Sequence, residues 1–304
     1  MRLLKPRALA VGARVALVAP AGPIAPERIE ASVGRCLSLG LDPVVYPAAS
    51  KRHRFLAGTD AERLGDLQSA FDDPSIDAIW SLRGGYGTVR ILDRLDLARQ
   101  RQRPIPFIGF SDNTTIHVRH ALLGTVSFHG PHPGADFPPE TEASFRRVLF
   151  SVEPAGRLPR REGEPEARTL RGGRVEARLV GGNLANLASL CGTDWALSAR
   201  GRILFLEDIG EPAYRVDRMM VQLERSGVLD GVLGLAFGRF TTAPGDAHPI
   251  VDVLADFAEK LGVPAVVDLP FGHVEHNCTL PVGVNAQLDA DAAQLEIIEA
   301  AVVS

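Results

Sequence analysis

The chain has 304 residues, enough for two domains at about 150 residues each, and 45% of them are hydrophobic, so a sizeable core can form. The net charge is −4 with both signs mixed along the chain, which argues against a basic nucleic-acid-binding patch and against a disordered acidic tail. The sequence contains no apolar run long enough to cross a bilayer, so we expect no membrane partner.

The cysteines and the N-terminal segment both bear on location. Cys36, Cys191 and Cys278 are isolated and odd in number, which fits neither a disulfide framework nor a zinc site and favours a reducing compartment. The first residues superficially resemble a secretory signal, but Arg14 interrupts the apolar run, and residues 15–18 fit a buried strand better. We therefore expect a soluble, cytoplasmic protein.

The first half of the chain alternates short apolar runs with segments of helical periodicity. Thr59 and Glu62 have the spacing of a capping box, which predicts the start of one helix. Continuous apolar strands that alternate with helices predict a doubly wound, mostly parallel sheet, whose ligands bind at the carboxyl ends of the strands. We expect strands at 15–18, 44–46, 77–82, 105–108 and 126–128, and helices at 26–39, 59–71, 89–95 and 112–123.

A glycine-rich loop, residues 83–88 (RGGYGT), follows the predicted strand at 77–82. Glycines between a strand and a helix let backbone N–H groups approach an anion closely, but the spacing here matches neither the P-loop nor the dinucleotide fingerprint. A structural turn and a binding loop therefore both stay open. Beside a nucleophile, one exposed N–H of this loop could supply half of an oxyanion hole.

Ser111 lies on the corner between the predicted strand at 105–108 and the helix that follows. A serine in this position points its hydroxyl at the carboxyl end of the sheet, and the first N–H groups of the helix point to the same place, which suits a nucleophile and its oxyanion. The corner matches a nucleophile elbow only in part, because Gly109 is present but Asn113 stands where the second glycine would be. The alternative is that Ser111 simply caps the helix.

Residues 151–168 (SVEPAGRLPRREGEPEAR) are rich in proline, glycine and alternating charge, which is typical of a linker. We therefore expect an N-terminal domain over 1–150 and a smaller C-terminal α/β domain over 169–304. In the second half we expect strands at 203–206, 232–237 and 265–268, helices at 184–190, 214–225 and 250–261, and a closing hairpin of 280–288 with 294–298.

Glu207 and His273 each stand just beyond a predicted strand, where side chains leave the core. A serine hydroxyl needs an adjacent base to act as a nucleophile at neutral pH, and that base needs a third group to fix its tautomer. The chain order serine, acid, histidine is one of the known orders for this arrangement. Taken singly, Glu207 also fits a solvated carboxylate at a strand end, and His273 a histidine in a turn.

Taken together, these residues resemble the LD-carboxypeptidase family of serine peptidases, also called muramoyltetrapeptide carboxypeptidases. The similarity runs from the first strand to the last hairpin, which makes it more specific than any single motif. The matching stretches are 18–22 (VAPAG), 55–60 (FLAGTD) with 62–63 (ER), 83–87 (RGGYG), 109–112 (GFSD), 128–131 (FHGP), 181–184 (GGNL), 206–209 (LEDI) with 215–218 (RVDR), 271–273 (FGH) and 279–283 (TLPVG).

The resemblance implies a cytoplasmic, homodimeric enzyme of peptidoglycan recycling that needs no cofactor or metal. It would hydrolyse the bond between the L-centre of a diamino acid and the terminal D-alanine of a murein tetrapeptide. By this resemblance Ser111 is the nucleophile, His273 the general base and then acid, and Glu207 the orienting carboxylate. The backbone N–H groups of Asp112 and Gly85 would form the oxyanion hole, in a cleft between the two domains.

A carboxypeptidase must also hold a free terminal carboxylate, for which a helix N-terminus or an arginine is suited. We expect substrate contacts from Gly84, Tyr86, Gly87 and Thr88, with Arg83 as a weaker candidate.

Three alternatives stay open. A microcin-immunity peptidase of the same family would carry the same triad but cleave a peptide–nucleotide conjugate. A metallohydrolase would use the pairs His117 with His120 and His129 with His132, which have a two-residue gap found in metal sites. A two-lobed binding protein would bind a ligand without turnover.

Overall fold

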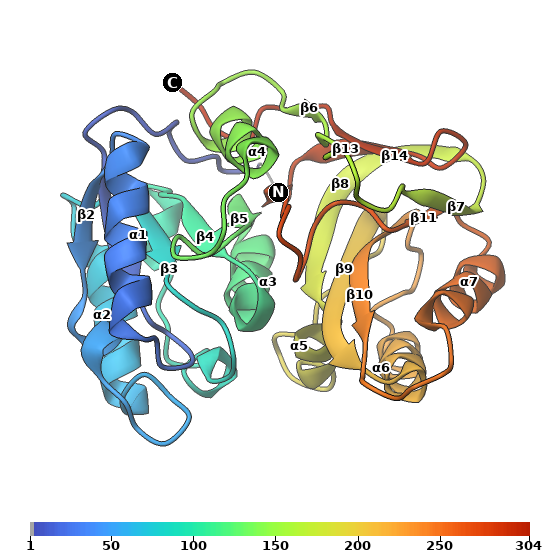
Figure 1. Ribbon diagram of the computed structural model, residues 1–304, viewed down its shortest axis with the longest axis horizontal. Helices are drawn as coiled ribbons and strands as arrows, with labels where there is room; N and C mark the ends of the chain where they lie inside the picture. Colours follow the sequence, from blue (N-terminus) through green and yellow to red (C-terminus); the bar gives the residue numbers. More distant parts are fainter. Residues whose placement is uncertain (1–2) are drawn as a thin grey trace.

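The computed structural model describes residues 3–304, which form two β-sheets standing side by side with helices around them (Figure 1). The first sheet has six strands in the order β12-β5-β4-β3-β1-β2, and all its strands are parallel except β12 at the edge. Its strands are β1 (Arg14–Val18), β2 (Asp42–Val45), β3 (Ala78–Ser81), β4 (Phe107–Gly109), β5 (Ser127–His129) and β12 (Leu280–Val282). The predicted α/β fold with a mostly parallel first sheet is confirmed.

The helices of this lobe follow its strands as the sequence predicts, because apolar positions at helical spacing bury one face of each helix. The Thr59 hydroxyl accepts the Glu62 N–H and the Glu62 carboxylate accepts the Thr59 N–H, so the predicted capping box is present. The sequence did not predict α4. The helices are α1 (Pro26–Ser38), α2 (Asp60–Asp72), α3 (Thr114–Leu123) and α4 (Pro139–Leu149), and α3 lies between the two sheets (Figure 1).

The second sheet has eight strands in the order β6-β14-β13-β8-β9-β10-β11-β7. Its centre, β8 to β11, is parallel, whereas the strands on either side pair antiparallel. The strands are β6 (Gly156–Arg157), β7 (Arg168–Arg171), β8 (Arg174–Asn183), β9 (Arg202–Glu211), β10 (Gly234–Thr242), β11 (Ala265–Val267), β13 (Asn285–Asp289) and β14 (Gln294–Ile297). The helices are α5 (Leu184–Ser189), α6 (Ala213–Arg225) and α7 (Ile250–Leu261). None of the helices in residues 3–304 has the length and apolar character needed to span a membrane.

The helix predicted at 89–95 is wrong. Only a 3₁₀ turn, Thr88–Arg90, forms there, and irregular turns follow it. The apolar side chains are buried as the periodicity indicated, but the Arg119 guanidinium of α3 takes up the carbonyls of Leu92 and Leu95. A long-range side chain thus satisfies backbone groups that a helix would have used internally.

The closing hairpin is also shorter than predicted. Residues 280–282 leave it and form β12, which pairs antiparallel with β5 at the edge of the first sheet. Gly283, at a φ of 105° that disfavours other residues, separates this strand from β13, so that only the β13 part of the predicted segment pairs with β14. The predicted linker 151–168 contributes β6 to the edge of the second sheet. After β11 the chain therefore returns to the first sheet as β12 and crosses back to the second as β13.

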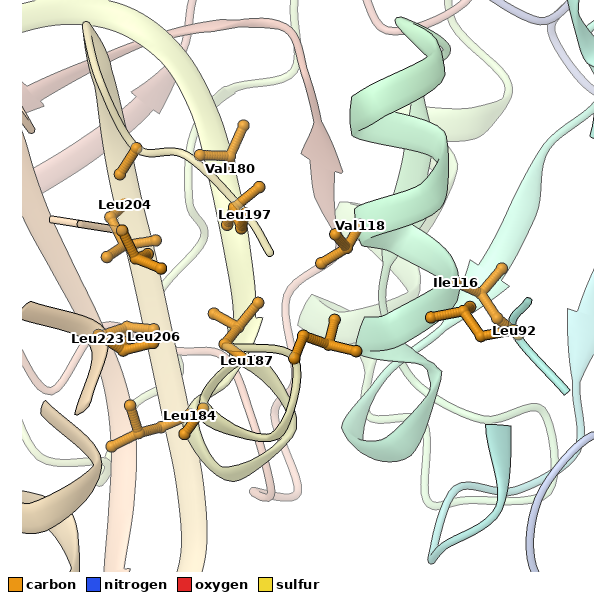
Figure 2. Packing of buried hydrophobic residues seen from close by; sticks show 14 of the residues in the cluster. Leu92, Ile116, Val118, Val180, Leu184, Leu187, Leu197, Leu204, Leu206 and Leu223 are labelled. Carbon is orange, nitrogen blue, oxygen red and sulfur yellow. The ribbon is translucent and has the colours of Figure 1, made fainter. Parts of the chain in front are cut away.

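The joint between the two sheets is apolar. One continuous cluster of buried side chains includes Val118 of α3 together with Leu187 of α5 and Val180 of β8. Figure 2 shows Val118 facing the second lobe while Ile116 of the same helix faces Leu92 of the first. Because interiors pack densely, such a core fixes the two lobes relative to one another.

Candidate active site

Ser111 occupies a backbone conformation that serine rarely adopts. It follows β4 and begins a 3₁₀ turn, Ser111–Asn113, that leads into α3, and its φ is 61°. For an L-residue this left-handed conformation costs roughly 1–2 kcal/mol. The Asn113 side chain and the His117 ring hold the corner, the first by donating to the Phe110 carbonyl at 3.0 Å and the second by contacting the Gly109 carbonyl at 2.8 Å.

The structure brings the three widely spaced polar residues into one hydrogen-bonded row. The Ser111 Oγ lies 3.0 Å from the His273 Nε2, and the His273 Nδ1 lies 2.6 Å from the Glu207 Oε2. Ser111 follows β4 of the first sheet, whereas Glu207 lies in the buried part of β9 and His273 follows β11. With a carboxylate on Nδ1, that nitrogen carries the proton, so Nε2 can accept the Ser111 hydroxyl proton.

The electrostatics of the row centre on His273. Burial of the ring acts to lower the pKa of His273, but the hydrogen bond and the negative charge of Glu207 outweigh it, so the pKa lies above the ordinary value of 6.5. Gly272 lets the two residues meet, because a Cβ at this position would lie 2.8 Å from the Glu207 Cβ. The Glu207 side chain is fully buried, and the His273 side chain is 16% exposed.

A second set of polar contacts ties the two lobes together next to this row. The Thr114 Oγ1 accepts the Asn183 N–H at 2.9 Å, and the Asn183 Nδ2 donates to the Asp208 Oδ1 at 2.9 Å. Burial first, and then the Glu207 charge, raises the pKa of Asp208 to about 6. Sequence reasoning missed Thr114, Asn183 and Asp208 as members of the site. The sequence held two signals for them: Thr114 lies three residues after Ser111, and Asn183 and Asp208 belong to the matching stretches 181–184 and 206–209.

The carboxylate of Asp112 holds the end of the glycine-rich loop in place. The Asp112 Oδ2 accepts the Thr88 N–H at 2.9 Å, and the Gly87 N–H also stabilises this carboxylate. The Thr88 hydroxyl donates to the Asp112 carbonyl at 2.6 Å. Burial raises the pKa of Asp112 above its ordinary value, although these hydrogen bonds oppose the shift. The anion that this loop cradles is therefore Asp112 itself.

Arg63 braces the same loop from the other side. Its fully buried guanidinium donates to the Gly87 carbonyl at 3.0 Å, to the Pro20 carbonyl, and to Asp60 at 2.6 Å. Sequence reasoning placed Arg63 in a family motif without assigning it a contact, because its partners lie 24 and 43 residues away.

The loop residues predicted to face a substrate divide into two groups. Gly85 and Tyr86 are exposed, whereas Gly84, Gly87 and Thr88 are buried. A Cβ at Gly84 would lie 3.1 Å from the Ser111 Oγ and 3.2 Å from the Asp112 N, so only glycine lets the loop approach the serine this closely. The Gly85 N–H donates no hydrogen bond within residues 3–304.

Of the four histidines considered for a metal site, His117, His120 and His129 are buried in the first lobe, and His132 is partly buried there. Burial lowers the pKa of His117 and His132 to about 4 and that of His120 to about 3, so these rings are neutral near pH 7. His117 and His120 contact the hydroxyls of Ser127 and Thr125 through Nδ1. Within residues 3–304, no three histidine, cysteine or acidic side chains are grouped as a metal would require.

Fold and site together define a two-lobed α/β protein whose joint carries a hydrogen-bonded hydroxyl, imidazole and carboxylate. The model of the LD-carboxypeptidase N-terminal domain matches residues 15–130, and that of the C-terminal domain matches residues 176–288. The chain belongs to the LD-carboxypeptidase family, as its sequence motifs predicted.

Individual relatives extend over nearly the whole chain. A protein from Streptomyces coelicolor that is named as a carboxypeptidase is 44% identical over 99% of this chain and 98% of its own length. The murein tetrapeptide carboxypeptidase of Pseudomonas aeruginosa is 36% identical over 92% of this chain and 94% of its own. The microcin C7 self-immunity protein, solved in complex with glutamyl sulfamoyl guanosine, is 25% identical, covers 99% of this chain and 100% of its own, and superposes with a TM-score of 0.87.

Proposed function

We propose that this protein is a serine carboxypeptidase that hydrolyses the L,D-peptide bond of murein tetrapeptide and releases the terminal D-alanine. The observation that carries the proposal is the hydrogen-bonded row of Ser111, His273 and Glu207. The family membership and the name of the Pseudomonas aeruginosa relative support the substrate class.

In the proposed mechanism the Ser111 Oγ attacks the carbonyl carbon of the scissile bond while the His273 Nε2 takes the hydroxyl proton. The buried Glu207 carboxylate stabilises the imidazolium that forms. The backbone N–H groups of Asp112 and Gly85 would donate to the oxyanion. His273 then passes its proton to the amine of D-alanine, which leaves, and the peptide stays bound to Ser111 as an ester.

A water molecule completes the cycle. His273 takes a proton from the water as its oxygen attacks the ester carbonyl, and returns that proton to the Ser111 oxygen as the ester bond breaks. The products are D-alanine and a tripeptide with a new carboxyl terminus. Every proton transfer runs through one imidazole nitrogen, the Nε2 atom that lies 3.0 Å from Ser111.

We also propose that the enzyme acts in the cytoplasm as a homodimer. Free Cys36, Cys191 and Cys278 suit a reducing compartment. Light scattering coupled to size exclusion measures the oligomeric state directly, and a monomer at micromolar concentration would contradict the dimer.

Mass spectrometry of murein tetrapeptide before and after incubation tests the main proposal. The expected result is loss of one D-alanine with the wild-type protein and not with the Ser111→Ala variant. Wild-type protein that leaves the tetrapeptide intact would contradict the proposal. A folded Ser111→Ala variant with full activity would remove Ser111 from the mechanism.

One alternative keeps the same triad but changes the substrate. The similarity to the microcin C7 self-immunity protein, with a TM-score of 0.87 over 99% of the chain, favours testing acyl-sulfamoyl nucleotides beside the tetrapeptide. A higher kcat/KM for the nucleotide conjugate would favour the alternative.

A further inference from the structure

A cavity of about 350 Å³ lies at the carboxyl end of the first sheet, outside the row of catalytic candidates. It is lined by the loops that follow β1, β3 and β5 and by the first turn of α1, which carries Arg28. In a parallel sheet this edge is where ligands bind. The wall residues used below are Ile24, Arg28, Leu82, Arg83, His132 and Ala135.

The cavity adjoins the candidate active site through two contacts. The Phe110 ring, directly before Ser111, lies 4.6 Å from the His132 ring and 4.8 Å from the His273 ring between centroids. Arg83 directly precedes Gly84, the residue packed against Ser111. Arg83 and His132 of the cavity wall therefore connect it to Gly84 and Phe110, the residues that flank Ser111.

The charge of the walls is positive. Arg28 and Arg83 contribute two guanidinium groups, and no aspartate or glutamate lines the cavity. Among residues 3–304, neither arginine forms an ion pair, whereas Arg63 and Arg90 of the same lobe both pair with Asp60. His132 adds no charge near pH 7, because burial lowers its pKa to about 4.

Each of the two guanidinium groups is oriented by the main chain. Arg28 donates to the Gly134 carbonyl, and Arg83 donates to the Pro23 carbonyl. A guanidinium has five N–H donors in a planar fork, so most donors of both groups remain available. Such forks match the geometry of a carboxylate. The rest of the wall is apolar, with Ile24, Leu82 and Ala135 around the charged groups.

A carboxypeptidase needs a holder for the terminal carboxylate, and Gly87 and Thr88 of the glycine-rich loop do not offer one. The Thr88 and Gly87 N–H groups already serve the Asp112 carboxylate, and Thr88 is buried. The two arginines without an ion-pair partner lie nearby, Arg83 at the start of the same loop and Arg28 on α1. The cavity that they line complements D-alanine, because its guanidinium groups suit the carboxylate and its apolar wall suits the methyl group.

From this arrangement we propose that the Arg28–Arg83 cavity binds the carboxylate and methyl group of the departing D-alanine. The inference rests on the proposed function and names the two arginines that would select substrates with a terminal carboxylate. It requires a free carboxyl terminus on the substrate. A substrate with a neutral group at that position loses the contact, since a neutral group cannot replace a carboxylate between two guanidinium groups.

The test compares two substrates across three variants. The substrates are murein tetrapeptide and the same peptide with its terminal carboxylate converted to an amide. The variants are Arg83→Gln, Arg28→Gln and, as a matched control, Arg147→Gln, which removes an exposed arginine of α4 outside the cavity. Circular dichroism and thermal melting establish that each variant is folded.

We expect wild-type and Arg147→Gln protein to prefer the carboxylate peptide. In Arg83→Gln and Arg28→Gln, kcat/KM for that peptide should fall by about tenfold to a hundredfold, mainly through KM, because a charge-assisted hydrogen bond is lost. The amide peptide should be cleaved about as well as by wild type, so the preference collapses. Inhibition by added D-alanine should weaken in the same two variants.

Two results would overturn the cavity assignment. One is an unchanged preference for the carboxylate peptide in both arginine variants, and the other is an equal loss on both substrates with unaltered inhibition by D-alanine. Release of D-alanine by the wild-type protein would then still support the proposed function. Absence of that release in the wild type would instead remove the function on which the inference rests.

Discussion

Replacing Glu207 with glutamine tests how the buried carboxylate supports His273. The 2.6 Å contact between Oε2 and Nδ1 joins a fully buried side chain to one that is 16% exposed. A hydrogen bond to a charged group is worth about 1.5–3 kcal/mol, so loss of the charge alone should slow the chemical step by about tenfold to about 150-fold. Glutamine can also donate to Nδ1, which would place the ring proton on Nε2 facing Ser111. With this reversed tautomer the loss should approach about 10⁴-fold, as in serine-protease triads.

The pH profile gives the same prediction a second readout. His273 must be neutral to accept the Ser111 proton, and Glu207 holds the pKa of His273 above 6.5. Activity of the wild type should therefore fall as the pH drops through that raised pKa, and the acidic limb of kcat/KM should move to lower pH in Glu207→Gln. Glu211→Gln, at the end of the same strand and paired with Arg215 at 3.6 Å, is the matched control. Wild-type turnover and an unmoved limb in Glu207→Gln would refute the orienting role.

The remaining predictions concern the corner, the loop and the joint. Ser111→Ala should lower kcat by several orders of magnitude in the tetrapeptide assay. Ser111→Gly should be equally inactive, but its unfolding free energy in urea titrations should be about 1 kcal/mol higher than that of Ser111→Ala, because glycine adopts the φ of 61° without strain. Asp112→Asn should lower the unfolding free energy by about 1–3 kcal/mol and reduce kcat more than it raises KM, since the loop that carries Gly85 loses its anchor. Thr114→Val leaves the buried Asn183 N–H without its acceptor and should lower the unfolding free energy by a similar amount, about 1–3 kcal/mol, measured the same way.

Local sequence patterns predicted the elements that depend on local physics. Apolar runs gave the strands of the first sheet, and the Thr59–Glu62 pair gave the start of α2. The failures have a common cause, which is a partner far along the chain. Arg119 takes the carbonyls that a helix at 89–95 would have used, and β5 recruits residues 280–282 away from the predicted hairpin.

The candidate site shows the same division. Ser111, Glu207 and His273 could be proposed because each stands just beyond a predicted strand, and their family motifs fix their order. The predicted strand before Glu207 is too short, since β9 continues to Glu211 and contains Glu207. Contacts between residues far apart in the sequence could not be predicted. The Thr88–Asp112 hydrogen bond joins residues 24 positions apart, and the Asn183–Thr114 hydrogen bond joins residues 69 positions apart. Arg83 could be named only as a weaker candidate for the carboxylate, and no local pattern distinguished Arg28 from the other arginines. What sets both apart is the lack of an acidic residue in the cavity wall, to which α1 and three loops contribute.

Because the row lies across a joint, the proposed mechanism makes the interlobe contacts important for catalysis. Thr114 lies three residues after Ser111, and its bond to Asn183 spans the same gap as the Ser111–His273 contact. Asp208, which directly follows Glu207, holds the Asn183 side chain within the second lobe. The apolar core of Val118, Leu187 and Val180 closes the gap beside them. A shift of one lobe by 1 Å would stretch the 3.0 Å contact beyond hydrogen-bonding range. Packing at the joint, and not only the three polar side chains, therefore sets whether His273 can accept the serine proton.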